Sequence, residues 1–350
     1  MPVTFTHVAD MLAHGRDCLI DARSPAEFVE DHIPGAINLP ALTDDQRHEV
    51  GSAYKQINPF TARKMGATYV ARNVADHVEQ RLSQHDGSWQ PLVYCWRGGQ
   101  RSGSFTLILQ QIGWRADTIE GGYKTWRRLV NKALYDEPLQ HRFVLLDGNT
   151  GTAKTAILNK VKAAGGQVID LEGLANHRGS LLGARPEGQP DQKWFETQLI
   201  EQIEGYDPAR PILVEAESSK IGRINLPPSL WTAMLSAPCI EISADLATRA
   251  AYLEHDYADM VDDPAELRKR IAPLHQQRGH ETVARWMAHL SAKNYGALAA
   301  DLMKDHYDPA YAKARAAYPR DVVATVRADT LDDAGQELAA QQVLAELKRL

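Results

Sequence analysis

The chain has 350 residues, 24% charged and 44% hydrophobic, with a formal net charge of −6, which is typical of a globular protein with about two domains. Its three cysteines have no paired spacing, which argues against a disulfide framework and a cysteine-rich zinc site. No apolar run approaches the roughly 18 residues that span a bilayer and no secretory pattern opens the chain, so we expect a cytoplasmic protein, without membrane association and monomeric.

The first part of the chain predicts a small α/β domain over residues 1–136. Residues 41–90 between its strands are mostly helical in character. Short runs that predict strands lie at residues 19–23, 92–94 and 116–119, and the run 32–40 turns into a further short strand. Because active sites of open parallel sheets lie at the carboxyl edge, the segment after residue 94 is a candidate site.

Cys95 opens that segment, in a loop that leads into a helix-like run beginning near residue 105. The candidate residues of the loop are Cys95, Trp96, Arg97, Gly98, Gly99, Gln100, Arg101 and Ser102. Backbone N–H groups and the positive helix end converge in such a loop, and arginines favour the thiolate form of a nearby cysteine. The pattern predicts a nucleophilic cysteine held beside an oxyanion site. Cys18 and Cys239 lie in apolar strand-like runs instead, so we expect both in the core.

A second α/β domain is expected over residues 137–245, with a helical region, 246–350, packed on it. Strands are predicted at residues 143–147, 167–170, 211–215 and 239–242. Their alternation with helical stretches indicates a parallel, doubly wound sheet of the P-loop type.

The run from Gly148 to Thr155 fits the phosphate-loop pattern between a strand and a helix. Ala153 stands where the general pattern has glycine, and its methyl group disfavours a positive φ. The pattern therefore predicts phosphate binding more firmly than ATP hydrolysis, and Thr155 could hold Mg²⁺ if that ion binds. The candidate phosphate ligands are Gly148, Thr150, Gly151, Thr152, Lys154 and Thr155.

Further polar residues follow the neighbouring strands. Glu215 and Glu217 end one strand and could hold a metal or water near the phosphate site, although an ordinary polar strand end explains them equally well. Arg178 is a candidate ligand for phosphate or an RNA backbone. No metal ligand set is certain from the sequence.

The first domain resembles the rhodanese homology domain. The runs Asp21–Phe28 and His32–Asn38 and the Cys95 loop match its pattern in order. Five residues separate Cys95 from Arg101, where four are usual, and five is the spacing of the related cysteine phosphatases and arsenate reductases. The resemblance therefore implies a loop large enough for a phosphate-bearing donor.

The order of motifs along nearly the whole chain resembles the tRNA 2-selenouridine synthases, which are transferases. Ala216 stands where an acid is expected in that family. The resemblance implies that the wobble 2-thiouridine of tRNA is first S-geranylated from geranyl diphosphate and then receives selenium from selenophosphate. Cys95, with its loop, would carry selenium as a selenosulfide, and the loop from Gly148 to Thr155 would hold the diphosphate.

Three alternatives remain at this stage. The chain could be a rhodanese-type sulfurtransferase with a nucleotide-binding second domain, or a cysteine phosphatase with Asp21 as a candidate general acid. It could also be a non-catalytic RNA-binding protein. Residues of the C-terminal region are candidate RNA contacts, although a helical cap on the sheet explains each of them better: Arg249, Tyr252, Arg268, Lys269, Arg270, Arg278, Arg285 and Trp286.

Overall fold

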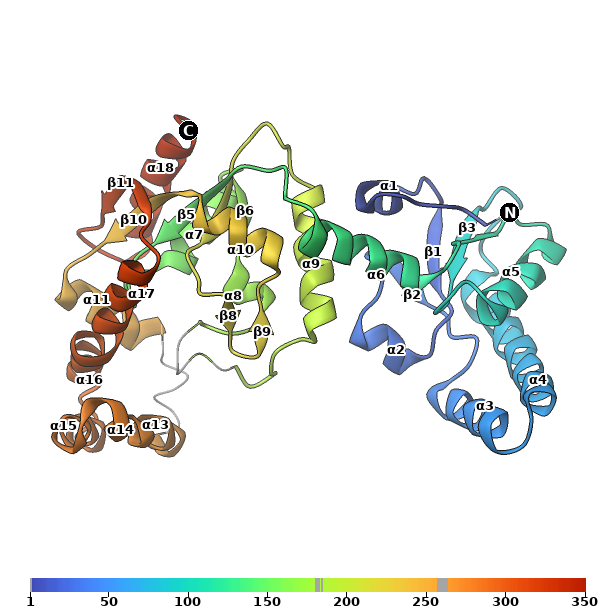
Figure 1. Cartoon of the computed structure of the whole chain (residues 1–350), viewed down its shortest axis with the longest axis horizontal. Coiled ribbons are helices and arrows are strands. Elements are labelled where there is room, and N and C mark those ends of the chain that lie inside the picture. Colours follow the sequence, from blue (N-terminus) through green and yellow to red (C-terminus); the bar gives the residue numbers. More distant parts are fainter. Residues whose placement is uncertain (1, 180–182, 184, 257–263) are drawn as a thin grey trace. The chain divides into compact units, whose positions relative to one another are not determined.

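The computed structural model describes residues 2–179, 183, 185–256 and 264–350, and their contacts form two compact units. Unit 1 comprises Met1–Glu137 and Asp191–Gly205, and unit 2 comprises Pro138–Pro190 and Tyr206–Leu350. Each unit is built on its own parallel sheet, with helices packed against it (Figure 1). The expected α/β fold class is therefore confirmed.

Unit 1 has a four-stranded sheet in the order β2-β1-β3-β4. The strands are β1 (Cys18–Asp21), β2 (Ala36–Asn38), β3 (Pro91–Tyr94) and β4 (Asp117–Thr118), and all neighbouring pairs are parallel. β3 is buried throughout because it lies between two other strands and beneath helices. These strands confirm the four runs that the sequence predicts.

Helices pack against the sheet, and helices also form the long segment between β2 and β3. Those of unit 1 are α1 (Val8–Leu12), α2 (Pro25–Glu30), α3 (Asp44–Gln56), α4 (Pro59–His77), η1 (Val78–Leu82), α5 (Gln100–Ile112), α6 (Tyr123–Asn131), η2 (Lys132–Asp136) and α9 (Gln192–Glu204). α3 begins at a capping box formed by Thr43 and Gln46, and α4 begins where the Asn58 side chain accepts from the Thr61 amide. The helical character expected for residues 41–90 is thus confirmed.

Helix α9 belongs to unit 1, although the sequence places it within the expected second domain of residues 137–245. It packs on α1 and α6, and the fully buried Trp126 donates through Nε1 to Thr197 Oγ1 at 3.1 Å. Arg127 of α6 also forms an ion pair with Glu196. A domain boundary drawn along the sequence misses this helix because its apolar face is buried against residues distant in the chain.

Unit 2 has a five-stranded sheet in the order β11-β10-β5-β7-β6, with parallel neighbours throughout. The strands are β5 (Phe143–Asp147), β6 (Gln167–Ile169), β7 (Ile212–Glu215), β10 (Pro238–Ser243) and β11 (Asp321–Arg327). The first four confirm the predicted strands. β11 corrects the expectation of a wholly helical C-terminal region: it is a β-branched run on an exposed sheet edge, where no alternation of burial marks it.

The helices of unit 2 include the long C-terminal series. They are α7 (Lys154–Ala163), α8 (Leu171–Leu174), α10 (Pro228–Leu235), α11 (Leu246–Asp256), α13 (Pro264–Ile271), η3 (Ala272–Leu274), α14 (His275–Arg278), α15 (His280–Ser291), α16 (Tyr295–Leu302), η4 (Met303–Tyr307), α17 (Asp308–Ala317) and α18 (Asp333–Leu347), with a short hairpin of β8 (Lys220–Ile221) and β9 (Ile224–Asn225). α7 and α18 pack together against the sheet and share its main core cluster. Within the described residues, no helix is both long and apolar enough to cross a membrane.

Candidate active site

Cys95 lies directly after β3, at the carboxyl edge of the unit 1 sheet. Its side chain is buried, and Ser102 Oγ donates to Cys95 Sγ at 3.2 Å. Within the described part of the chain, the amides of residues 96–99 have no hydrogen-bond acceptor. Unpartnered amides that surround a cysteine before a helix start are a suitable cradle for an oxyanion.

The shape of this loop depends on two glycines in the left-handed region. Gly98 has φ +65°, and a Cβ there would lie 2.7 Å from the Ile119 carbonyl oxygen. Gly122 has φ +57°, and its Cβ would lie 2.2 Å from the Cys95 carbonyl oxygen. The turn at Gly122 supports the loop from behind, since the Tyr123 amide donates to the Cys95 carbonyl at 2.8 Å. The sequence carries this signal only as the pair Gly121-Gly122.

The two arginines of the loop occupy different environments. Arg101 Nη1 donates to Glu27 Oε2 of α2 at 2.6 Å, whereas Arg97 is exposed. Burial raises the pKa of Glu27, but the hydrogen bond and charge of Arg101 more than offset this and lower it overall. Arg101 is therefore anchored as an ion pair, and Glu27 is a site residue that the sequence did not single out.

The remaining loop residues lie between the end of β3 and the first turn of α5. The Trp96 and Tyr123 rings are 5.2 Å apart, and Gly99 and Gln100 are exposed. Gly99 caps α5, whose first residue is Gln100. The loop thus combines exposed residues at the start of α5 with aromatic packing at Trp96.

Asp21 is unsuited to act as a general acid for a phosphatase. Its carboxylate is fully buried and accepts from Arg23 Nη2 at 2.6 Å and from Arg23 Nε at 3.0 Å. The Arg23 guanidinium in turn lies 3.9 Å from the centre of the Tyr123 ring. Asp21 therefore fixes the structure beneath the cysteine loop, which weakens the phosphatase alternative.

The phosphate loop of unit 2 joins β5 to α7. Within the described residues, the amides at positions 149–151 and 153 have no acceptor, and Lys154 Nζ donates to the Gly148 carbonyl at 2.7 Å. Ala153 adopts φ 56°, the left-handed conformation that its methyl group disfavours, and that methyl is buried in the main core cluster. The Thr152 hydroxyl donates to the Asn149 carbonyl at 2.8 Å. The loop accordingly keeps the form expected of a phosphate site despite alanine at position 153.

Carboxylates at the ends of two neighbouring strands, β6 and β7, meet beside this loop, and Glu215 among them is buried. Thr155 Oγ1 lies 2.8 Å from Glu215 Oε1 and 3.3 Å from Glu172 Oε2, and the Glu172 amide donates to Glu215 Oε2 at 3.0 Å. Burial, reinforced by neighbouring carboxylates, raises the pKa of Glu172 to about 8 and that of Glu215 well above its usual range. Burial also raises the pKa of Glu217, against the lowering influence of Lys154. Glu172 is a site residue that the sequence did not single out.

The donor atoms for Mg²⁺ are limited. Among the described residues, no three His, Cys, Asp or Glu side chains are grouped to share one ion. The Thr155 hydroxyl and the Glu215 carboxylate are adjacent, however, and Mg²⁺ in phosphate sites commonly takes one or two protein oxygens while phosphate and water supply the rest. These two residues therefore fit a phosphate-bound Mg²⁺ but not a site made by protein alone.

A cavity of about 560 Å³ lies over the phosphate loop. Thr150, Gly151, Thr152, Lys154 and Thr155 line it, as predicted. Glu172 and Arg178 also line it, together with Arg185, Tyr252 and Tyr311. The cavity therefore brings Arg178 together with the predicted phosphate ligands other than Gly148, whose amide donates to Asp147 Oδ1 at 2.6 Å.

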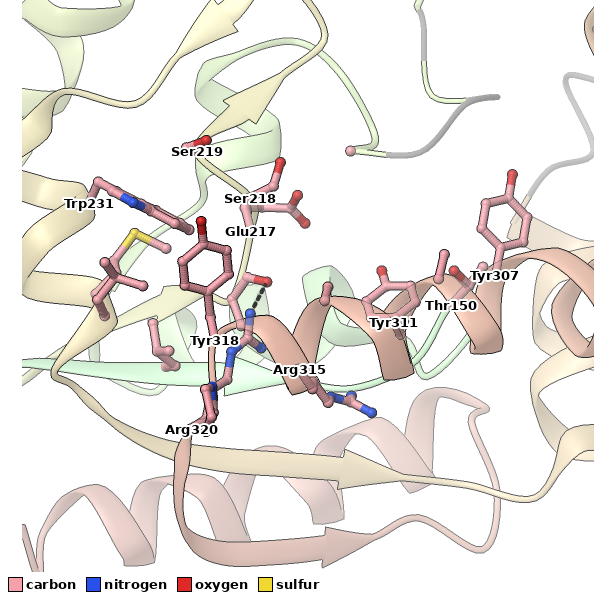
Figure 2. A pocket seen from close by; sticks show the side chains of 18 of the residues that line it. Thr150, Glu217, Ser218, Ser219, Trp231, Tyr307, Tyr311, Arg315, Tyr318 and Arg320 are labelled. Carbon is pink, nitrogen blue, oxygen red and sulfur yellow. Dashed lines mark hydrogen bonds between the residues drawn. The ribbon is translucent and has the colours of Figure 1, made fainter. Parts of the chain in front are cut away.

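An apolar pocket of about 380 Å³ adjoins the same site (Figure 2). Trp231 and Met234 of α10 and Ala314 and Tyr318 at the end of α17 line it, and the Trp231 and Tyr318 rings make an edge contact at 5.7 Å. Figure 2 shows Trp231 and Tyr318 at one end and Tyr311 and Thr150 toward the other. Thr150 and Tyr311 line both this pocket and the cavity over the phosphate loop. The two spaces are thus neighbours with a shared wall.

Two arginines border the apolar pocket and are held by one carboxylate. Arg320 Nη1 and Arg315 Nε lie 2.5 Å and 2.9 Å from Asp147 Oδ2. Arg320 also donates through Nη2 to the Ala216 carbonyl at 3.1 Å, and Glu217 lines the pocket beside them. The pocket therefore combines aromatic and aliphatic side chains with three charged ones, those of Glu217, Arg315 and Arg320.

The candidate RNA contacts of the C-terminal region are mostly engaged within the protein. Arg249 is buried and bonded to Asp308, and Trp286 is fully buried in a core cluster between helices. Arg285 pairs with Asp301 and Arg270 with Glu266. Arg278 donates to the His306 carbonyl and Arg268 to Ser291, whereas Lys269 is 80% exposed. This pattern is that of a helical cap, the interpretation that the sequence favoured.

Comparison with known proteins decides between the families. Residues 4–129 match the rhodanese-like domain, and residues 141–284 match the tRNA 2-selenouridine synthase AAA domain. A tRNA 2-selenouridine synthase of Shewanella denitrificans is 32% identical over 329 residues, which cover 84% of this chain and 87% of that protein. The chain belongs to the tRNA 2-selenouridine synthase family.

Other known proteins align with a smaller part of this chain. The tRNA 2-selenouridine synthase of Alcanivorax borkumensis is 39% identical over 249 residues, and the aligned part covers 68% of this chain and just under two thirds, 66%, of that relative. A rhodanese-related protein of known structure from Thermoplasma volcanium is 17% identical with a TM-score of 0.23, covering 36% of this chain and 90% of that one. Family membership rests on the Shewanella relative, which is covered nearly throughout.

Proposed function

We propose that the chain converts wobble 2-thiouridine in tRNA to 2-selenouridine, by S-geranylation followed by selenium exchange, and that it acts in the cytoplasm. The observation that carries the proposal is the pairing of two chemically different sites. Cys95 lies in an amide-lined loop of unit 1, and the phosphate loop of unit 2 adjoins an apolar pocket. Neither site alone would suit both reactions.

The site in unit 2 suits a donor with a phosphate head and an apolar tail. The amides of the phosphate loop, with Lys154, would hold the diphosphate of geranyl diphosphate, with Thr155 and Glu215 beside an accompanying Mg²⁺. The pocket around Trp231 and Tyr318 would hold the geranyl chain, because the two spaces share Thr150 and Tyr311. The thiouridine sulfur attacks the first carbon of the chain, and diphosphate leaves with the bonding electrons.

The site in unit 1 suits the second step. The Cys95 thiolate attacks the selenium atom of selenophosphate, whose oxygens the loop amides hold. The selenium–phosphorus bond breaks, and its electron pair leaves with phosphorus as phosphite. The resulting selenosulfide delivers selenium to carbon 2 of the base, where a carbon–selenium bond forms and geranyl thiolate leaves. Two equivalents of a small thiol then reduce the sulfur–selenium bond. They leave as their disulfide, which releases the selenouridine and returns Cys95 to its thiol form.

The alternatives explain fewer observations. A plain rhodanese-type sulfurtransferase has no use for an apolar pocket beside a phosphate loop, and a phosphatase lacks Asp21 as a free acid. An RNA-binding scaffold has no use for a cysteine surrounded by unpartnered amides. The sulfurtransferase alternative predicts persulfide formation from thiosulfate without any requirement for tRNA.

The test separates the two steps by substitution. Full-length protein is incubated with thiolated tRNA, geranyl diphosphate and selenophosphate, and the digested nucleosides are identified by mass spectrometry. We expect Cys95→Ser to abolish selenation while geranylation continues, because only the second step uses the thiol. We expect Lys154→Ala to reduce geranylation severely, while selenation of tRNA geranylated beforehand continues.

Matched controls are available for both variants. Cys18→Ser changes a cysteine of β1 outside the loop, and Lys162→Ala removes an exposed lysine near the end of α7. Both controls should keep both activities. Loss of both activities in Cys95→Ser or in Lys154→Ala, with the fold retained by circular dichroism, would refute the division of labour between the two sites.

A further inference from the structure

A polar groove of about 860 Å³ lies in unit 1 between α3, α4 and the first turn of α5. We call it the α3–α4 groove, and the side chains that matter are Arg47, His48, Tyr54, Lys55, Arg63 and Arg101. It is separate from the phosphate cavity and the apolar pocket, which are both formed by residues of unit 2. The mechanism proposed above leaves it without a role.

The charge of the groove is opposite to that of the whole chain. None of its lining residues is Asp or Glu, although the chain has a formal net charge of −6. Arg47 and Arg101 both contact Glu27, which offsets part of their charge. Lys55 and Arg63 are exposed and have no hydrogen-bond or ion-pair partner in the described part of the chain. These two side chains leave the groove positively charged and able to bind an anion.

Exposed rings lie beside these cations. Tyr54 lines the groove and is 55% exposed, and Phe60, at the start of α4, is 67% exposed. The Lys64 ammonium lies 5.2 Å from the centre of the Phe60 ring. Cations that can follow a phosphate backbone, next to rings on which bases can stack, are the combination that proteins use for unpaired nucleic acid.

The groove also reaches the reactive loop. Its inner end is formed by Gln100, Arg101 and Ser104, in the first turns of the helix that follows the Cys95 loop. A strand bound along the groove would therefore run toward the entrance of the cysteine cradle. Among the described C-terminal residues, Arg249, Arg270 and Arg285 are instead paired with carboxylates.

We infer that the α3–α4 groove binds the unpaired anticodon loop of tRNA and brings the modified base to Cys95. This inference rests on the proposed function, since it names where the RNA substrate of that reaction is held. Lys55 and Arg63 contact backbone phosphates, and Tyr54 stacks on a base. An acidic protein partner would use the same charges but would not need the exposed ring.

The test measures binding of full-length protein to an anticodon stem-loop RNA over a range of salt concentrations by fluorescence anisotropy. The Lys55→Ala/Arg63→Ala variant should bind about tenfold more weakly, and the slope of log K against log salt should fall by about 1.4, or about 0.7 for each phosphate contact removed from a single strand. Tyr54→Ala should weaken binding about fivefold or more with the slope unchanged, because stacking releases no counterions.

The matched control is Arg72→Ala/Arg81→Ala, which removes the same charge from exposed positions that do not line the groove. It should keep wild-type affinity, and Lys55→Arg/Arg63→Lys should restore binding. An equal loss of RNA affinity in the control and groove variants, or no loss in either, would overturn the inference. Selenation by the wild type would still support the proposed function. If the wild type does not bind the RNA at all, both the inference and the proposed function are refuted.

Discussion

Gly98 shows how one backbone position sets the geometry of the reactive loop. It has φ +65°, and any Cβ at this position would meet the Ile119 carbonyl oxygen at 2.7 Å and the Gly121 amide nitrogen at 3.1 Å. Backbone atoms cannot move aside as a flexible side chain can. The loop around Cys95 therefore depends on glycine here for two reasons, its dihedral angle and its contacts.

Gly98→Ala should consequently destabilise unit 1 and impair the cysteine site. The left-handed conformation alone costs alanine roughly 1–2 kcal/mol, and the backbone clash adds to this. We expect a loss of more than about 2 kcal/mol in the free energy of unfolding, measured by urea denaturation, together with slower alkylation of Cys95 by iodoacetamide.

The control for this prediction is Gly103→Ala, in the first turns of α5 and five residues after Gly98. A Cβ there meets nothing within 4 Å, and glycine inside a helix is less favourable than alanine by roughly 0.5–1 kcal/mol. This variant should be as stable as the wild type or more so. If Gly98→Ala and Gly103→Ala have the same free energy of unfolding, steric restriction at Gly98 does not determine the shape of the loop.

Ala153 illustrates a different balance at the residue scale. The sequence predicted that its methyl group would hinder a positive φ, yet the residue adopts φ 56°. The cost of about 1–2 kcal/mol is partly offset because the methyl group is buried in the main core cluster, where a CH₂-sized group contributes about 0.8 kcal/mol. Packing of the Ala153 methyl group against the core thus favours a backbone conformation that alanine itself disfavours.

At the scale of elements, the ends of β6 and β7 place carboxylates where they repel one another. Glu172 follows β6 and Glu215 ends β7, and these strands are paired neighbours in the sheet. Burial and this proximity keep protons on the cluster and raise the pKa of Glu172 to about 8. Repulsion between the ionised carboxylates lowers the stability of the folded protein when no cation is bound. A site that receives a phosphate-bound metal ion is expected to have this property.

The stability of unit 2 should therefore fall as the pH rises. The folded state keeps the Glu172 proton up to about pH 8, whereas an unfolded glutamate, with an ordinary pKa of 4.5, has already lost it. Between these values the folded state binds more protons, so the free energy of unfolding decreases with pH. Glu172→Gln has no proton to lose, and its unfolding should depend less on pH between about 5 and 8.

Urea unfolding at pH 5, 6.5 and 8 checks this prediction in the absence of added metal and phosphate. Glu187→Gln is the control, since it alters an exposed carboxylate that lines the same cavity. The control should follow the wild type. If the free energy of unfolding changes with pH equally in the wild type and in Glu172→Gln, Glu172 is not the group that holds the proton.

At the scale of the whole molecule, the two units are interleaved in sequence. Helix α9 lies between segments of unit 2 but packs in unit 1, where Thr197 accepts from the indole of the fully buried Trp126. Unit 1 is thus not complete at residue 137. Its stability depends on a helix that the chain supplies more than 50 residues later, from Asp191 onward.

Thr197→Val should destabilise unit 1 in particular. The substitution keeps the side-chain shape but leaves the buried Trp126 N–H without an acceptor, a loss of about 1–3 kcal/mol. Native-state hydrogen exchange should show faster opening of the amides in β1, β3 and α6 and no change in the slowest amides of β5 and β7.

Thr232→Val serves as the comparison, because Thr232 is exposed on α10 in unit 2. It should leave the exchange of both units close to wild type. Equal acceleration of both units by Thr197→Val would show that α9 does not belong to unit 1 alone.

The sequence by itself determined the features that contiguous residues encode. Apolar runs specify strands such as Phe143–Asp147, because a strand buried on both faces needs an unbroken apolar segment. The Cys95 loop and the Gly148–Thr155 run are likewise local, since each follows a strand and opens a helix. β11 escaped prediction because an exposed edge strand has no such pattern of burial.

Only the tertiary structure decided which distant residues share a site. It placed Glu172 beside Thr155, anchored Arg101 on Glu27, and brought Trp231 and Tyr318 together. The same packing assigned α9 to unit 1. It also left Lys55 and Arg63 without a partner among the described residues, in a groove whose lining includes residues of the reactive loop. These relations depend on how helices and strands pack across long sequence separations, and the pattern of neighbouring residues carries no record of that packing.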